Sequence, residues 1–212
     1  MRSLLFACRF GIMASFVMAL CLLSHASLAD PAAVVTAFDD QTRKMLKDVE
    51  LTPVDRLQRF HALVDEAFNF PVIAHYVLGR YWQSTADDVR QEFTRVFEDY
   101  AIEAYTRRLN EYGGKPASVM GERAESQGIT IVTTKLALAD GDEPTTVEWR
   151  VETTTNGLKI TDVIVAGVSM ALSYREQFAA AIQRNGGRVA ALTSELKGKL
   201  AVKISDAASS KQ

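Results

Sequence analysis

Residues 147–170 read VEWRVETTTNGLKITDVIVAGVSM, and this pattern predicts a β-hairpin at the centre of the fold. From residue 147 onward, apolar side chains alternate with charged ones, which is the period of a strand with one buried face and one solvated face. The Asn156-Gly157 pair that follows is a strong signal for a tight turn. We therefore expect the first strand to pair antiparallel with a second strand over residues 158–170.

On the N-terminal side of this hairpin, the sequence predicts two more strands, so that the sheet is a four-stranded antiparallel meander. The expected extra strands cover residues 117–123 and 128–138. Helical periodicity indicates helices over 31–46, 53–69, 72–79 and 86–112 before the sheet and over 173–185 and 189–204 after it. Ser173 and Glu176 have the spacing of a capping box at the start of the first helix after the sheet. This order predicts an α+β fold, a curved sheet packed against several helices as an NTF2-like cone.

The chain divides into one domain and two terminal segments. No repeat, low-complexity tract or linker interrupts residues 30–204, so a single domain is expected there. Residues 205–212 are mostly small and polar, and we expect a flexible tail.

Residues 1–29 have the three parts of a secretory signal peptide. They contain Arg2 and Arg9 but no acidic residue, then an apolar run over 10–23 and a small-residue end at Ala29. The apolar run is shorter than the roughly 20 residues that a membrane span needs. We therefore predict cleavage after Ala29 and a periplasmic product.

The composition excludes several functional classes. With 24 Lys and Arg against 26 Asp and Glu, the chain lacks the basic surplus of nucleic-acid-binding proteins, so no nucleic-acid partner is expected. Cleavage would remove both cysteines and leave His61 and His75, too few ligands for a zinc site, and no cofactor is predicted. Ser169 lies in a segment similar to a nucleophile elbow, but no histidine follows it, so no catalytic residue is predicted.

Several short motifs together resemble the MlaC, or toluene-tolerance, family of exported phospholipid-binding proteins. The resemblance covers nearly the whole chain after residue 29, and Asn69 stands where the family often has Asp. The motifs are Phe68-Asn69-Phe70, Leu78-Gly79-Arg80-Tyr81-Trp82, Glu92-Phe93, Asp162-Val163, Gly167-Val168-Ser169 and Tyr174-Arg175-Glu176-Gln177-Phe178.

This resemblance implies a periplasmic carrier that holds phospholipid acyl chains in an apolar cavity. Such a carrier shuttles lipid between an outer-membrane lipoprotein complex and an inner-membrane ABC transporter with its substrate-binding subunit, which maintains the lipid asymmetry of the outer membrane. Two acyl chains expose about 30 methylene groups, so carrying them unshielded through water costs on the order of 20 kcal/mol. The carrier therefore needs a dry cavity.

We expect the inner face of the sheet and the wide apolar face of the helix over residues 86–112 to enclose the acyl chains. The start of the helix that follows the sheet would lie near one end. Arg80 and Arg175 are candidate neighbours of the lipid head group. The predicted lipid-binding residues are Phe93, Phe97, Tyr100, Tyr105, Val147, Trp149, Val151, Ile160, Ile164, Val168, Met170, Tyr174 and Phe178.

Three alternatives remain open at this stage. A hopanoid-associated branch of the same family would carry a different lipid. A small isomerase-like enzyme with a cone fold would place an acid or base, such as Asp162, in a compact polar cavity, whereas a carrier needs a long apolar one. An adaptor that binds only protein would have a filled core and no cavity.

Overall fold

The structure is a computed structural model of the 212-residue chain, and it describes residues 30–109, 115–137 and 143–209. Three helices at the start are each opened by a side-chain cap. Asp30 accepts from the Ala32 N–H at the start of α1 (Pro31–Lys47) and Thr52 from the Asp55 N–H at the start of α2 (Pro53–Ala67). Asn69 does the same for α3 (Phe70–Leu78). A 3-10 turn, η1 (Gly79–Tyr81), leads to the long helix α4 (Asp87–Leu109).

The sheet has five antiparallel strands in the order of the chain. They are β1 (Ala117–Ser126), β2 (Ile129–Leu136), β3 (Thr145–Thr154), β4 (Gly157–Val165) and β5 (Val168–Ser169). The predicted hairpin is confirmed, because β3 pairs with β4 and the turn between them is Thr155-Asn156. The fold is α+β, as predicted, with helices before and after the sheet.

The segment after the hairpin corrects the prediction of one strand over residues 158–170. Ala166 and Gly167 both have positive φ, at 49° and 82°, and this tight reversal separates β4 from the short strand β5. Helix α5 (Met170–Arg184) then begins with Ser169 as its N-cap and not with Ser173. The Ser173 hydroxyl instead donates to the Ser169 carbonyl within the first turn.

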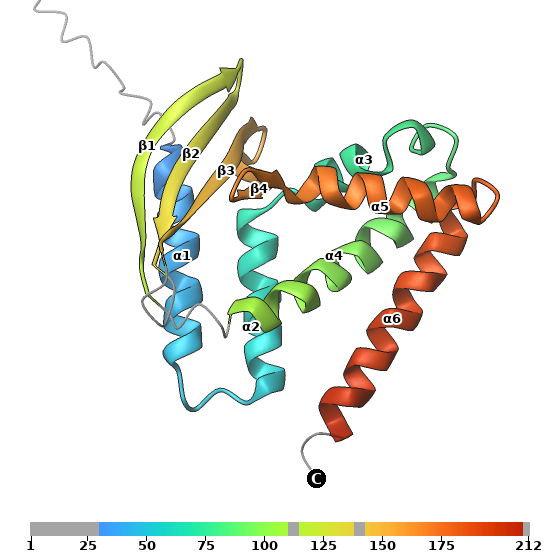
Figure 1. Cartoon of the computed structure of the whole chain (residues 1–212), viewed down its shortest axis with the longest axis horizontal. Coiled ribbons are helices and arrows are strands. Elements are labelled where there is room, and N and C mark those ends of the chain that lie inside the picture. The colour runs from blue at the N-terminus through green and yellow to red at the C-terminus, as the bar shows by residue number, and fades with distance from the viewer. Residues whose placement is uncertain (1–29, 110–114, 138–142, 210–212) are drawn as a thin grey trace, which may run out of the picture.

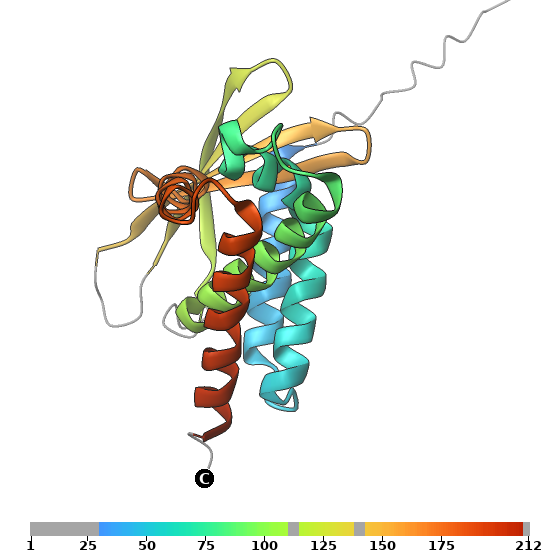
Figure 2. The ribbon, with the colours of Figure 1, turned by 90° about the vertical axis from the view of Figure 1, so that its right-hand side faces the viewer.

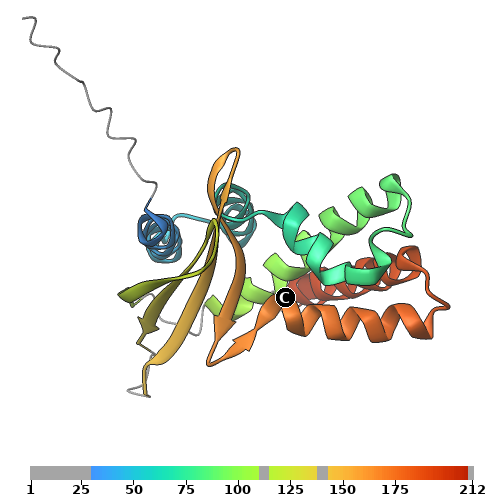
Figure 3. The same ribbon diagram turned by 90° about the horizontal axis from the view of Figure 1, so that it is seen from above.

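The last helix, α6 (Val189–Ser209), continues past residue 204 into the segment for which a tail was expected. The end of the helix expected over 86–112 lies outside the described residues. Figure 3 shows α1 and α2 end-on against one face of the sheet, with α3, α4, α5 and α6 grouped beyond β4. Figure 2 looks along α5 and shows α6 leaving it at a steep angle, and α6 packs along α4.

This arrangement produces two clusters of buried side chains. The larger one, the helical core, is made by residues of α1 to α6 and has Phe93, Phe97 and Phe178 at its centre. The smaller one lies between α1 and the sheet and includes Val35, Val132 and Ile160. A backbone hydrogen bond of 3.0 Å from Asn69 N–H to the Ile160 carbonyl ties the α2–α3 junction to β4, between the two clusters.

Candidate functional site

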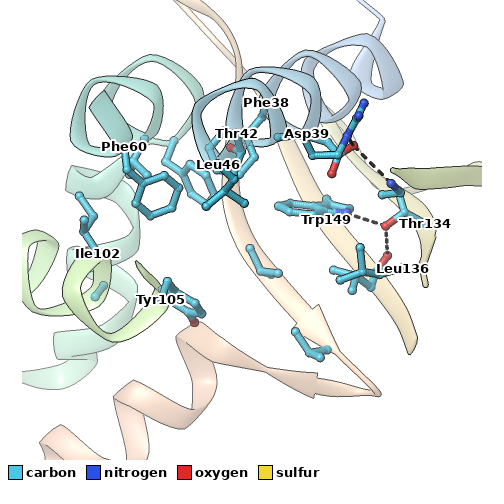
Figure 4. Close-up of a pocket in the computed structure, with 18 of the residues that line it drawn as sticks. Phe38, Asp39, Thr42, Leu46, Phe60, Ile102, Tyr105, Thr134, Leu136 and Trp149 are labelled. Carbon is cyan, nitrogen blue, oxygen red and sulfur yellow. Dashed lines mark hydrogen bonds and ion pairs between the residues drawn. The ribbon is translucent and has the colours of Figure 1, made fainter. Parts of the chain in front are cut away.

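An apolar cavity of about 170 Å³ lies between α1, α2, the second half of α4 and the inner face of the sheet (Figure 4). It follows the line along which the helix pair and the curved sheet diverge. Its lining residues are Phe38, Asp39, Thr42, Arg43, Leu46, Phe60, Val64, Phe68, Phe70, Ala101, Ile102, Tyr105, Lys115, Ala117, Thr134, Leu136, Val147, Trp149, Val163 and Val165.

On the sheet side, the polar atoms of the wall are satisfied within the wall itself. Trp149 Nε1 donates to Thr134 Oγ1 at 3.0 Å, and Thr134 Oγ1 donates to the Val147 carbonyl at 3.1 Å. The indole ring therefore presents hydrocarbon to the cavity while its N–H stays hydrogen-bonded. Val163 and Val165 on β4 continue this apolar surface.

On the helix side, the wall is a stripe along α1. Phe38, Thr42 and Leu46 are spaced four residues apart and so fall on one face. The Phe38 ring meets Phe68 edge-on at 5.2 Å between ring centroids and Trp149 at 6.0 Å, which connects the helix pair to the sheet. The aromatic rings frame the cavity without filling it.

Charged groups gather at one end of the cavity, where α1 meets the start of β1. Arg43 Nε donates to Asp39 Oδ2 at 3.0 Å, and the same carboxylate oxygen accepts from Ala117 N–H at 3.3 Å. Arg43 also pairs with Asp40, and Lys115 lines the cavity beside this group. In Figure 4, Asp39 lies at this polar end, away from the apolar end around Ile102 and Tyr105. The cavity thus has a polar end and an apolar end.

A second cavity of about 50 Å³ adjoins the first and leads toward α5. The two share five wall residues, namely Phe68, Phe70, Ala101, Tyr105 and Val163. Beyond these, the second cavity is lined by Ile73, Phe97, Thr161, Asp162, Met170, Ala171 and Tyr174. The two cavities therefore adjoin at these shared side chains, between the α1–β1 edge and the start of α5.

The structure places six of the thirteen predicted residues at these cavities. Tyr105, Val147 and Trp149 line the larger cavity, and Phe97, Met170 and Tyr174 line the smaller one with Tyr105. The other seven line neither cavity. Phe93, Val151, Ile160 and Phe178 are buried, Tyr100 and Ile164 are half-buried, and Val168 is 57% exposed.

Strict alternation along β4 puts Ile164 on the same face as Ile160, and a β-bulge between them explains why it is not there. Arg150 pairs with Asp162 but Val151 pairs with Ile160, so Thr161 is an extra residue on β4. An extra residue moves every later side chain to the opposite face. Val163 therefore faces the cavity, while Ile164 does not. The alternating pattern of β3 contained no sign of this shift, because the bulge is on its partner.

Helices α1 and α2 also contribute to the cavity wall, although no residue of theirs was among those predicted. Phe38, Leu46 and Phe60 all line the larger cavity. The apolar stripe of α1 indicated a buried face. The sequence of such a stripe does not distinguish a helix that packs against a filled core from one that borders a cavity. A threonine at the centre of that stripe, Thr42, was the one unusual feature.

Arg80 and Arg175 were considered as neighbours of the lipid head group, and Asp162 as an acid or base. The surroundings of these three residues do not suit those roles. Neither arginine lines either cavity, since Arg80 is on η1 and Arg175 stacks over the Tyr76 ring at 5.0 Å.

Asp162 is 3% exposed and accepts hydrogen bonds from Ser169 Oγ at 2.5 Å, Ala171 N–H at 3.0 Å and Val163 N–H at 2.8 Å. Its carboxylate also pairs with Arg150 at 3.4 Å. A carboxylate held by this many donors braces β4 against α5, an arrangement that does not favour a general base.

Within residues 30–109, 115–137 and 143–209, there is no group of three or more His, Cys, Asp or Glu that could hold a metal ion. No helix in the same ranges is both long and apolar enough to cross a bilayer.

Comparison with known proteins identifies the family of the chain. A solved structure of the phospholipid-binding protein from Ralstonia solanacearum in complex with a phospholipid matches with a TM-score of 0.69 at 25% sequence identity. The match covers 82% of this chain and 98% of that chain. A family model described as "MlaC protein" matches residues 36–198. The chain therefore belongs to the MlaC family of phospholipid-binding proteins.

Proposed function

We propose that this protein is a periplasmic lipid carrier. It holds phospholipid acyl chains in the cavity between α1, α2 and the sheet and shuttles lipid between two membrane complexes. These are an outer-membrane lipoprotein complex and an inner-membrane ABC transporter with its substrate-binding subunit. The observation that carries the proposal is the apolar cavity itself, whose lining suits hydrocarbon. Membership of a phospholipid-binding family supports the same conclusion.

The proposed export agrees with the start of the fold. Helix α1 begins at Pro31, directly after its capping residue Asp30, and Asp30 would be the first residue after cleavage. The described fold thus starts at the predicted cleavage site. We therefore propose that the signal peptide is removed on export.

Lipid binding has to enlarge the cavity. Pockets for drug-sized ligands span about 300–1,000 Å³, more than the two cavities of about 170 and 50 Å³ provide. The shared side chains of Phe68, Phe70 and Tyr105 separate the two cavities. Rotation of these rings would join them and let an acyl chain extend toward α5.

The distribution of charge orients the lipid. Its head group would lie at the polar end, beside Asp39, Arg43 and Lys115, and its acyl chains would run toward Tyr105. This orientation leaves the charged part of the lipid near water and moves the methylene groups away from it.

Native mass spectrometry of protein purified from a bacterial periplasm tests the proposal. We expect a bound diacyl lipid that organic extraction recovers. A clean lipid-free mass, with nothing extractable, would contradict it.

Two neighbouring residues of β4 provide a matched pair for the same measurement. Val163→Lys places a charge on the cavity wall, so we expect more than a tenfold loss of retained lipid because the ammonium group resists burial. Ile164→Lys places the same charge on the opposite face, where lipid retention should stay near the wild-type level. Equal losses in both variants would favour a role for Val163 in folding alone.

A further inference from the structure

Thr42 carries a buried hydroxyl that the fold does not satisfy. Its side chain lies on α1 between Phe38 and Leu46, at the cavity wall, and the residue is 5% exposed (Figure 4). In the part of the chain that the structure describes, its Oγ1 is one of two buried side-chain polar atoms without a hydrogen-bond partner. An unsatisfied buried hydroxyl destabilises a folded protein, so its position calls for an explanation.

Other threonines of the helices show that the helical environment is not the cause. The hydroxyls of Thr94, Thr106 and Thr193 each donate to the carbonyl four residues earlier, at 2.8, 2.8 and 3.1 Å. This is the usual way for a threonine within a helix to satisfy its hydroxyl. Thr42 differs from them in bordering the cavity.

The order of polarity around Thr42 matches that of a diacyl lipid. From the apolar end of the cavity around Ile102 and Tyr105, α1 first presents the face that carries Leu46 and Thr42 (Figure 4). Toward the polar end it presents the adjacent face, which carries the charged pair of Arg43 and Asp39. Along a phospholipid, the acyl chains are followed by the ester carbonyls and then by the phosphate. With the head group at the polar end, the ester carbonyls come to the level of Thr42.

An ester carbonyl only accepts hydrogen bonds, so in a dry cavity it needs a donor. Other donors of the same wall are already engaged, because Trp149 Nε1 donates to Thr134 and Arg43 donates to Asp39 and Asp40. We propose that the Thr42 hydroxyl donates a hydrogen bond to an ester carbonyl of the bound lipid, an inference that rests on the proposed carrier function.

A rotation about the Cα–Cβ bond aims the hydroxyl at the lipid, since threonine in helices has two accessible rotamers.

A pair of phosphatidylcholines tests this directly. The two lipids have the same head group and chain length, but one is a diester and the other a diether that lacks the carbonyls. We expect delipidated wild-type protein to retain the diester about three- to tenfold more tightly, the difference that one hydrogen bond makes. Retention is measured by competition in native mass spectrometry.

The isosteric Thr42→Val variant sharpens the test. It should bind both lipids equally, at the wild-type diether level, while the melting temperature of the lipid-free protein stays the same or rises because a buried unsatisfied hydroxyl is removed. Thr94→Val is the matched control, because its hydroxyl bonds only to its own helix and it lines neither cavity. This control should keep the diester preference.

Three results would overturn the inference. One is equal retention of the two lipids by the wild type, and another is a diester preference that persists in Thr42→Val. The third is a lowered melting temperature of Thr42→Val together with unchanged lipid binding, which would assign the hydroxyl a structural partner. Retention of neither lipid by the wild type would instead contradict the carrier function itself, and this inference with it.

Discussion

Two regions of the interior contain similar aromatic residues and differ in how these rings meet. In the helical core, Phe93 stacks on Phe97 at 5.6 Å, and Tyr174 and Phe178 meet Phe97 edge-on at 5.1 and 5.4 Å. These rings fill most of the space between the helices that carry them, and of the four only Phe97 and Tyr174 border the smaller cavity at the edge of this core. Between α1, α2 and the sheet, by contrast, comparable rings surround a cavity. The number of aromatic side chains therefore does not decide whether a cavity forms. The spacing between the helices α1 and α2 and the sheet decides it.

The largest expected effect comes from removing one buried ring that borders neither cavity and one that borders the larger cavity. Phe93→Ala empties a fully buried site in the helical core and should lower the free energy of unfolding by about 3–5 kcal/mol. Phe60→Ala removes a ring that already borders the cavity, so fewer contacts are lost and the cost should be clearly smaller. Urea unfolding of the lipid-free proteins measures both. If Phe60→Ala costs as much as Phe93→Ala, the cavity region is as tightly packed as the helical core.

The opposite change, adding volume, should separate the two regions by function. Ala101 and Ala181 are both buried helical alanines, but only Ala101 borders the cavities. Ala101→Leu extends into the passage between the cavities, so we expect more than a tenfold loss of lipid retention with little change in stability. Ala181→Leu overpacks the helical core, which should cost about 1–3 kcal/mol and leave lipid retention unchanged.

Native mass spectrometry and urea unfolding of both alanine variants provide the comparison. A destabilised Ala101→Leu that still retains lipid would show that the space beside Ala101 is not part of the binding site.

The fold was predictable from the sequence because its signals are local. The turn at Asn156 and the changes of hydrophobic period depend only on neighbouring residues, and they were enough to predict an α+β order with a central hairpin. The site was less predictable because it depends on tertiary geometry. The bulge at Thr161 reverses the faces of β4, and the spacing between α1 and the sheet decides whether a stripe containing Phe38 packs or borders a cavity.

Helix α4 shows the same dependence on tertiary geometry. Its aromatic residues suggested a cavity wall, yet Phe93 is completely buried in the helical core and Tyr105 borders both cavities. One helix serves both regions, and the boundary runs across its length. No sequence pattern marks that boundary, because both parts of α4 are apolar on the face they bury.

A third prediction concerns the seam between α2 and α4, beside the larger cavity. Glu98 on α4 hydrogen-bonds to Asp65 on α2, and Val64 and Ala101 nearby line the cavity. Burial, the Asp65 hydrogen bond and the charges of Asp65 and Asp99 raise the pKa of Glu98 to about 8. Protonated Glu98 can donate to Asp65, so the seam is held by a shared proton over a wide pH range.

This raised pKa predicts the sign of the pH dependence. In the unfolded chain, Glu98 loses its proton near its ordinary value of 4.5, whereas the folded protein keeps it up to about 8. The free energy of unfolding therefore falls as pH rises from about 4.5 to 8 and falls no further above that window. Glu98→Gln keeps a donor for Asp65 and removes the titration, so its thermal stability should fall less between pH 5 and pH 8.5 than that of the wild type.

Glu195→Gln is the control, because hydrogen bonding to Lys199 lowers the pKa of Glu195 instead of raising it. This variant should therefore lose stability between pH 5 and pH 8.5 as the wild type does. Identical pH profiles for the wild type and Glu98→Gln would show that the acidic pair does not hold a proton. A flattened profile would make α2–α4 the contact that weakens at alkaline pH.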